Sequence, residues 1–471
     1  MIPDVLAARY ASQEMAALWS AEHKVVLERR LWLAVLRAQN DLGLDVPASV
    51  IDDYEAVVEK VDLASIEARE RVTRHDVKAR IEEFCALAGH EHVHKGMTSR
   101  DLTENVEQLQ VRDSLALVRD RLVAVLARFA ARAVEHRDLP IVGRSHNVPG
   151  QTTTLGKRFA IWAEELLLAF DRVDHLVAGY PLRGLKGPMG TQQDQLDLLD
   201  GDLGKLDALE AAIARHLGFD RTLTSVGQVY PRSLDFEVVS ALVQVASGPA
   251  NFAKTVRLMA GLDLVTEGFK EGQVGSSAMP HKMNTRSSER INGLAVVLRG
   301  HLSMVSELTG DQWNEGDVSC SVVRRVALPG AFFAIDGLLE TTMTVLDEFG
   351  VFPAVVEREL RRYEPFLATT SLLMQLLKMG LGREEAHEIV KEHAVAAALE
   401  LRDGGEHNTL LDRLAADTRV PSDRAGILQA LARQGALVGA ATRQVDDVVA
   451  RVERVIERHP DAATYNPGAI L

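Results

Sequence analysis

The sequence predicts an all-α protein built around a bundle of long helices. Ala, Leu, Val, Glu and Arg are plentiful and aromatic residues make up only 5% of the 471 residues, a composition that favours helices. Few segments alternate apolar and polar residues as half-buried strands do. Apolar residues instead recur at steps of three and four, which places them on one face of a helix. One such run contains Leu115, Val118, Leu122, Val125 and Phe129.

Two further long helices are predicted in the middle of the chain. The first runs from about Leu234 to Val265, and Gly248-Pro249 should kink or interrupt it. Three helices with stripes close to heptad spacing predict a bundle, and the same spacing allows helices of different subunits to pack together. The second helix carries Ile291, Leu294, Leu298, Leu302 and Val305.

The chain is expected to form three domains, since a domain typically holds about 150 residues. Short helices fill residues 1–107, the long-helix bundle fills 108–350, and shorter helices fill 351–471, starting near Phe352-Pro353. Polar or glycine-rich stretches interrupt the helices of the middle domain, and loops held by rigid helices often carry chemistry. These stretches are 143–153, 184–195, 224–233 and 268–290.

Charge and cysteine usage narrow the class of protein. The formal net charge of −14 argues against general binding to nucleic acid or to an anionic membrane, both of which need a basic surface. Only Cys85 and Cys320 occur, so a disulfide framework is not expected and a reducing compartment fits. The first residues do not read as a signal peptide, and no apolar run approaches the ~18 residues of a membrane helix. We therefore expect a soluble, cytoplasmic protein.

The stretch 268–290 is the strongest candidate for chemistry. Its glycines permit backbone shapes that other residues avoid and let the loop close. The hydroxyls of Ser276 and Ser277 and the charge of Lys282 could bind a developing oxyanion. The alternative is a solvated, flexible loop without a catalytic role.

The stretch 143–153 sets His146 among many hydrogen-bonding groups. Histidine titrates near neutrality and suits general acid–base catalysis. The alternative is a capping histidine in a polar turn.

Two further stretches have the character of anion sites at helix starts. Arg74-His75-Asp76 could bind a phosphate or carboxylate, although Asp76 in a first helical turn would be favourable for the helix dipole alone. Thr98 and Ser99 stand beside cationic residues and could bind an anion. Either could also be a simple N-cap, and both roles can hold together. No zinc, dinucleotide or P-loop pattern is present, so neither a metal nor a cofactor is expected.

Taken together, these stretches resemble the fumarase/aspartase superfamily. The run from Gly275 to Asn284 is similar to its signature G-S-S-x-M-P-x-K-x-N, although Thr285 stands where proline is usual. The resemblance implies an all-α, three-domain fold whose central helices form a twenty-helix core in a homotetramer. It also implies active sites built from three subunits and fumarate as a product.

Within that superfamily the chain resembles the adenylosuccinate lyase family over almost its whole length. The stretch 143–153 departs from the family's T-H-x-Q-P pattern at Ser145, Asn147 and Val148, but it retains the histidine. The matching positions are Ala8-Arg9-Tyr10, Arg74-His75-Asp76, Thr98-Ser99, His146, the turn 187–192 with Thr191, Gln228, Ser288-Glu289-Arg290, Ser321 and Arg325.

The resemblance implies a β-elimination and assigns roles to these residues. Ser276 would be the base, with Ser277 the alternative, and His146 would protonate the leaving nitrogen. Glu289 would orient that imidazole, and Lys282 would stabilise the oxyanion together with Asn284. His75 would bind phosphate or assist the acid. The phosphate and carboxylates would be held by Arg9, Tyr10, Arg290, Ser321 and Arg325. The succinyl end and the base would be oriented by Thr98, Ser99, Thr191 and Gln228. The remaining residues of the site would be Arg74, Asp76 and Met279.

Two other readings remain. One is another superfamily lyase, such as argininosuccinate lyase, fumarase, aspartase or a carboxymuconate cycloisomerase, which would keep the signature loop. The stretch 74–76, Gln228 and the Ser321/Arg325 pair favour a nucleotide substrate. The other is a non-catalytic structural protein on the same scaffold, which would have no need of Ser276, His146 and Lys282.

Overall fold

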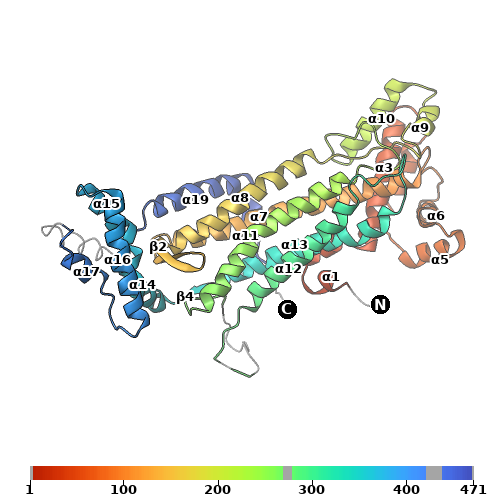
Figure 1. Cartoon of the computed structure of the whole chain (residues 1–471). Helices are drawn as coiled ribbons and strands as arrows, with labels where there is room; N and C mark the ends of the chain where they lie inside the picture. The colour runs from red at the N-terminus through yellow and green to blue at the C-terminus, as the bar shows by residue number, and fades with distance from the viewer. Residues whose placement is uncertain (1–3, 269–277, 280, 421–436, 469–471) are drawn as a thin grey trace.

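The computed structural model describes residues 4–268, 278–279, 281–420 and 437–468. The prediction of an all-α fold around long helices is confirmed. Figure 1 shows the long helices running side by side along an elongated molecule. These helices are α7 (Ser99–Glu135), α8 (Leu155–Gly179), α11 (Ser233–Ala260), α12 (Arg286–Glu307) and α13 (Cys320–Glu348).

Helix α7 forms where the apolar spacing predicted it. Every residue of the predicted stripe from Leu115 to Phe129 is fully buried. The N-terminal end is capped because the N–H of Thr98 donates to a carboxylate oxygen of Asp101 at 2.9 Å, which is half of a capping box. A helix of 37 residues is about 55 Å long, so α7 separates whatever lies at its two ends by that distance.

Helix α11 corrects one expectation. It runs unbroken from Ser233 to Ala260 with Pro249 inside it. Of the predicted kink or interruption at Gly248-Pro249, the interruption is therefore wrong. Both residues are buried, and a Cβ on Gly248 would lie 3.3 Å from the backbone oxygen of Trp162. This close packing against α8 holds the helix together where proline removes a hydrogen bond.

The N-terminal helices gather at one end of the bundle (Figure 1). In the same picture α9 and α10 join α3, α5 and α6 at that end. Helix α1 packs against α13, and α2 packs against α7 and α13. Their bounds are α1 (Val5–Arg9), α2 (Gln13–Leu18), α3 (Ala21–Asp41), α4 (Ala48–Glu55), α5 (Leu63–Thr73), α6 (Asp76–Ala88), α9 (Gln193–Leu198) and α10 (Leu203–His216).

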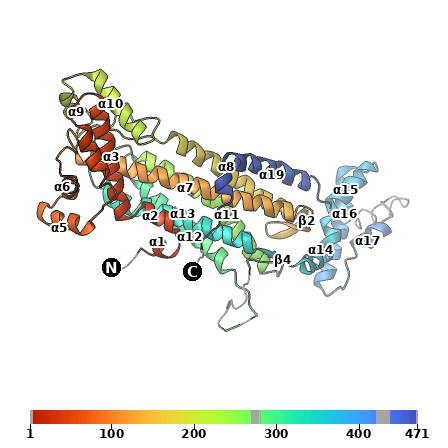
Figure 2. The same ribbon diagram turned by 180° about the vertical axis from the view of Figure 1, so that it is seen from behind.

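The C-terminal helices occupy the opposite end and then return. Helices α14 to α17 include residues of a small apolar core of their own, separate from the main one. Helix α19 turns back and packs along α7 and α8 (Figure 2). The boundaries at 107/108 and 350/351 stay predictions. The bounds are α14 (Pro353–Leu367), α15 (Thr369–Lys378), α16 (Arg383–Arg402), α17 (Leu410–Ala416), α19 (Ala441–Arg458) and α20 (Pro460–Ala463).

Two short antiparallel pairs interrupt the helices. The predicted loop 143–153 lies within a hairpin of β1 (Pro140–Ser145) and β2 (Val148–Thr154). The sequence missed it because the strands are short and polar, and the turn is made by His146 and Asn147, both with positive φ, as tight hairpin turns require. The second pair joins β3 (Val265–Thr266) to β4 (Gly350–Val351). Among the described residues, no helix is both long and apolar enough to cross a membrane.

Candidate active site

One group of predicted site residues lies where α6 and α7 begin. His75 caps α6, its Nδ1 accepting the N–H of Lys78 at 3.3 Å, and its Nε2 lies 3.5 Å from the hydroxyl oxygen of Ser99. Burial acts to raise the pKa of Asp76, but the Arg80 guanidinium at 3.1 Å, the N–H of Val77 and the nearby charges of His75 and Lys24 together lower that pKa below its ordinary value. We call the predicted residues near these helix starts the helix-start cluster. They are Arg74, His75, Asp76, Thr98, Ser99, Thr191, Gln228 and Ser321.

The buried carboxylate of Asp101 organises this cluster. One oxygen accepts hydrogen bonds from the Nη1 of Arg183 at 2.6 Å, the N–H of Lys186 at 2.9 Å and the N–H of Gly187 at 3.0 Å. The other accepts the N–H of Thr98 at 2.9 Å. Hydrogen bonds to a charged, buried acceptor are strong and costly to leave unmade. Asp101 therefore fixes the start of α7 against the turn that leads to Thr191.

Arg183 extends the same network to the loop that carries Gln228. Its Nη2 donates to the carbonyls of Gly187 at 3.2 Å and Gly227 at 2.9 Å. The N–H of Gln228 donates to the Glu315 carbonyl at 2.6 Å. The structure thus brings the stretches near Thr98, Thr191 and Gln228 together within one chain.

Two residues at the start of α13 have different surroundings. The hydroxyl oxygen of Ser321 accepts the Nη2 of Arg100 at 3.0 Å, and Arg100 also contacts Glu104 at 3.2 Å. This places Ser321 in the helix-start cluster. Arg325 is exposed on the next turn and lines a small pocket with Trp19 and Lys24.

His146 lies at the opposite end of the molecule, at the tip of the β1–β2 hairpin. The side chain is exposed, and the hairpin is braced by ion pairing of Arg144 with Glu359 of α14 and by a 2.6 Å hydrogen bond from Gln151 to Thr370. The hairpin thus presents the imidazole to solvent within one chain.

A third group lies in and beside the run from Gly275 to Asn284, which we call the signature stretch. Glu267 is buried, and its carboxylate accepts the N–H groups of Ser287 and Ser288 and the Ser288 hydroxyl, all at 2.8 Å. A pocket of about 570 Å³ beside α12 is lined by Lys282, Asn284 and Glu289. The predicted oxyanion and acid-orienting groups therefore share one cavity. Met279 is exposed, and Ser276 and Ser277 lie outside the described residues.

Arg9, Tyr10 and Arg290 come together beside this third group. The Arg290 guanidinium lies 5.7 Å from the centre of the Tyr10 ring. Burial lowers the pKa of Arg290, Tyr10 acts to raise it, and the nearby charges of Arg9 and Arg286 lower it further. Guanidinium groups crowded in this way are well placed to receive a phosphate or carboxylate.

The helix-start cluster and the His146 hairpin do not meet within one chain. Ser99 begins α7, whereas the hairpin with His146 follows its end, so the two lie at opposite ends of a helix about 55 Å long. Figures 1 and 2 show this separation from both sides. In the described part of one chain, His146 and Glu289 form no hydrogen bond with each other. A site that uses both Ser99 and His146 needs a second copy of the chain.

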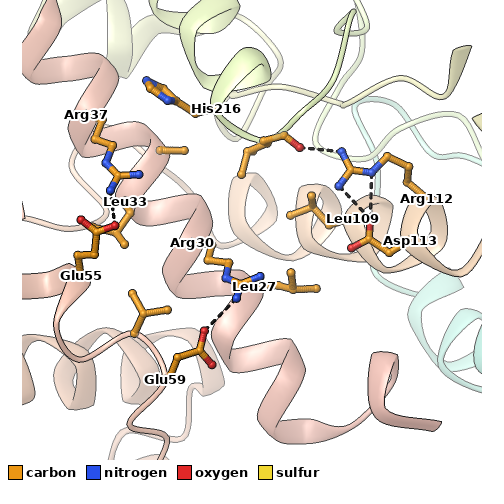
Figure 3. Close-up of a pocket in the computed structure, with 13 residues that line it drawn as sticks. Leu27, Arg30, Leu33, Arg37, Glu55, Glu59, Leu109, Arg112, Asp113 and His216 are labelled. Atoms are coloured by element: carbon orange, nitrogen blue, oxygen red, sulfur yellow. Dashed lines mark hydrogen bonds and ion pairs between the residues drawn. The ribbon is translucent and has the colours of Figure 1, made fainter. Parts of the chain in front are cut away.

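A further pocket, shown in Figure 3, is unrelated to these groups. It has a volume of about 460 Å³ and lies between α3, the segment following α4, α7 and α10. Its arginines are bonded already: Arg30 to Glu59 at 2.9 Å and Arg37 to Glu55 at 2.6 Å. Arg112 donates to the Leu217 carbonyl at 2.6 Å. No predicted site residue lines this pocket.

The sequence analysis missed the buried residues that hold the site together. Asp101 could have been found, because a threonine followed three residues later by an acid is the pattern of a capping box. Arg183 and Glu267 have no comparable local signal, since their partners lie far along the chain. Across the part of the chain that the structure describes, no group of three or more His, Cys, Asp or Glu side chains could hold a metal ion.

Two known families match separate parts of the chain. A family described as "Lyase" matches residues 11–300, and one described as "Adenylosuccinate lyase C-terminus" matches residues 365–448. The first match includes the helix-start cluster except Ser321, the hairpin and the signature stretch.

Curated relatives are similar over nearly the full chain. The chain is 35% identical to an adenylosuccinate lyase of Saccharomyces cerevisiae, over 94% of this chain and 93% of the relative. It is 32% identical to an adenylosuccinate lyase of Schistosoma mansoni, over 98% of this chain and 97% of the relative.

Solved structures share the fold at lower identity. A fumarate lyase from Mesorhizobium sp. BNC1 matches with a TM-score of 0.79 and 23% identity, covering 94% of this chain and 98% of that one. A β-carboxy-cis,cis-muconate cycloisomerase from Acinetobacter calcoaceticus matches with a TM-score of 0.80 and 18% identity, covering 95% and 100%. These likenesses support the fold alone.

Proposed function

The chain belongs to the adenylosuccinate lyase family, and from this premise we propose that it releases fumarate from adenylosuccinate to give AMP. We propose the same β-elimination for the succinyl-aminoimidazole carboxamide ribotide of purine biosynthesis, which gives AICAR. The observation that carries the proposal is the 35% identity to a named adenylosuccinate lyase over 94% of this chain. The muconate cycloisomerase likeness is a likeness of fold and does not favour that activity.

The difficult step is removal of a weakly acidic proton beside a carboxylate. The base takes this proton, negative charge builds on the carboxylate, and the bond to the purine nitrogen breaks as that nitrogen is protonated. We assign the base to Ser276, with Ser277 as the alternative, and the acid to His146. Lys282 and Asn284 would stabilise the developing charge, and their shared cavity supports this role.

Substrate binding divides between two groups. We propose that Arg9, Tyr10 and Arg290, with Ser321 and Arg325, hold the phosphate and carboxylates. The crowding of guanidinium groups around Arg290 supports an anion there. In the helix-start cluster, Thr98, Ser99, Thr191 and Gln228 would orient the succinyl end, Arg74 and Asp76 would line the site, and His75 would bind phosphate or assist the acid. Met279 would complete the signature side of the site.

We propose that copies of the chain assemble into a homotetramer and share active sites. The separation of His146 from Ser99 along α7 supports sharing. Exposed apolar side chains along the central helices support a partner surface, because large exposed apolar patches mark interaction sites. These side chains include Leu258, Val296, Met304, Val322 and Val326.

The expected setting follows from the reaction. The proposed elimination uses side chains of the protein alone, so no metal or cofactor is assigned. We place the enzyme in the cytoplasm as a purine-pathway lyase, with no nucleic-acid or membrane partner.

Fumarate release by the purified protein tests this proposal. Adenylosuccinate, argininosuccinate and aspartate are offered separately, and release from adenylosuccinate alone is the expected result. Release only from another substrate would keep a lyase of this fold but reject the nucleotide assignment. A folded protein that releases no fumarate from any of them would favour the structural role.

A further inference from the structure

We propose that the buried pair Asp101–Arg183 is the positioning unit for the succinyl end of the active site. This inference rests on the proposed function, because it concerns the residues assigned there to the succinyl carboxylates. Neither side chain is exposed, so neither touches substrate. Their effect would pass through the backbone of three segments, which carry Thr98, Thr191 and Gln228.

The two side chains form hydrogen bonds with backbone groups of those segments. The Asp101 carboxylate binds the N–H groups of Thr98, Lys186 and Gly187 in addition to Arg183. The Arg183 guanidinium reaches the carbonyl of Gly187 and that of Gly227, which lies 44 residues after Arg183 along the chain. One ion pair at 2.6 Å thus connects a helix start, a turn and a distant loop.

Side chains of α7 also form hydrogen bonds with the backbone N–H and C=O groups of the segment 181–187, as a neighbouring strand would do in a sheet. Asn105 exchanges hydrogen bonds with Gly184, its Oδ1 accepting at 2.9 Å and its Nδ2 donating at 3.0 Å. Gln108 accepts the N–H of Arg183 at 2.6 Å and donates to the Pro181 carbonyl at 3.0 Å. Asp101, Asn105 and Gln108 are spaced four and three residues apart, so they share one helix face. The segment 181–187 is buried, and this face sets its register up to the turn that carries Thr191.

The geometry of the guanidinium matters as much as its charge. Only a planar fork can donate to Asp101 with one nitrogen and to two backbone carbonyls with the other. A lysine at position 183 keeps the positive charge beside Asp101 but cannot also reach Gly187 and Gly227. Arg183→Lys is therefore expected to loosen Thr191 and Gln228 without leaving Asp101 as an uncompensated buried charge.

Arg29 provides a matched control. It is equally buried, pairs with Glu83 at 2.6 Å, and donates to the carbonyls of Val57 at 2.9 Å and Val58 at 2.8 Å. Arg29 therefore binds one carboxylate and two carbonyls, where Arg183 binds one carboxylate and three carbonyls, but Arg29 contacts none of the three site segments. Arg29→Lys reports the general cost of losing such a fork.

Product inhibition separates positioning from general instability. In the assay of fumarate release from adenylosuccinate, added fumarate probes the succinyl end and added AMP probes the nucleotide end. For Arg183→Lys, we expect the inhibition constant of fumarate to rise about tenfold or more, since small displacements weaken oriented contacts steeply, and that of AMP to stay within about twofold. For Arg29→Lys, we expect both constants to stay within about twofold of wild type, because distant sites act independently.

The outcomes distinguish this inference from the proposed function. Wild-type protein inactive on adenylosuccinate would reject the function. If the wild type is active but the inhibition constants of fumarate and AMP are both unchanged, or raised equally, in Arg183→Lys, only the positioning role is overturned. If Arg183→Lys does not fold, Asp101→Asn is measured in the same way, because it keeps the shape of the carboxylate, and the same selective loss of fumarate affinity is required.

Discussion

The carboxylate of Glu267 accepts a hydrogen bond from the hydroxyl of Ser288 at 2.8 Å, and this contact joins the two flanks of the signature stretch. The same carboxylate binds the N–H groups of Ser287 and Ser288. It stands at the N-terminal end of α12, where negative charge is favourable. Glu267 therefore fixes where α12 begins and, with it, where Glu289 and Arg290 lie.

Replacing Glu267 should weaken both the fold and catalysis. We expect Glu267→Ala to lower the free energy of unfolding by about 2 kcal/mol, since two backbone donors and a hydroxyl lose their buried acceptor. The shifted helix start should lower kcat by about tenfold or more. Urea unfolding and fumarate release measure the two effects.

Asp202 serves as the control for this prediction. Its carboxylate caps α10 through the N–H of Lys205 at 3.0 Å, far from the signature stretch. Asp202→Ala should cost about 1 kcal/mol of stability and leave kcat unchanged. A Glu267→Ala protein with wild-type kcat would reject the anchoring role.

A pair of glycines tests the close packing of the Thr191 turn on the Gln228 loop. Gly190 has a φ of +80°, and a Cβ there would overlap the carbonyl oxygen of Val226. Gly187 has a similar φ of +72° but no atom within 4 Å of that position. We expect Gly187→Ala to cost about 1 kcal/mol from its backbone conformation alone.

Gly190→Ala should cost more, because the neighbouring backbone must move as well. We expect a loss of about 2–4 kcal/mol in unfolding free energy and a raised KM for adenylosuccinate. Equal effects of the two substitutions on stability and on KM would show that the two loops do not depend on each other.

The buried ring of His94 should make stability depend on pH. Its Nδ1 accepts the indole N–H of Trp32 at 3.1 Å, and burial lowers its pKa from the ordinary 6.5 to about 4. Between these two pH values the unfolded chain binds a proton that the folded chain does not. Stability should therefore fall as the pH drops from about 6.5 to 4.

Comparison of His94→Asn with wild type across that range measures this contribution. Asparagine tolerates the positive φ of 69° at this position and retains an acceptor for Trp32. The variant should lose stability less steeply on acidification, whereas His175→Asn, at an exposed position on α8, should follow wild type. Parallel curves for wild type and His94→Asn would contradict this assignment.

The sequence predicted the helices well because their signal is local. The stripe from Leu115 to Phe129 is a repeated spacing within one helix, and each of those side chains is buried. The β1–β2 hairpin was missed because its strands are polar and its turn depends on backbone angles at His146 and Asn147. Pro249 in α11 was predicted to kink or interrupt the helix, because the packing of Gly248 against α8 cannot be seen in the sequence.

The candidate site was found only where its residues form motifs. His75, Thr98 and His146 each stand in a recognisable run, so their positions could be named. The contacts of Asp101, Arg183 and Glu267 join residues up to 86 positions apart, and no local pattern encodes them. How the three groups would meet across copies depends on assembly, which no single sequence motif describes.

The most direct test of the account is complementation between two inactive variants. In one chain, helix α6, which His75 caps, and the β1–β2 hairpin, which carries His146, lie at opposite ends of the bundle (Figure 1), so the proposed site must take the two histidines from different copies. His75→Ala and His146→Ala proteins are each prepared, mixed and allowed to exchange subunits, and fumarate release from adenylosuccinate is measured. In random assemblies about a quarter of the sites receive both intact histidines, so activity should recover to about that fraction of wild type. No recovery after verified subunit exchange would contradict a site shared between copies.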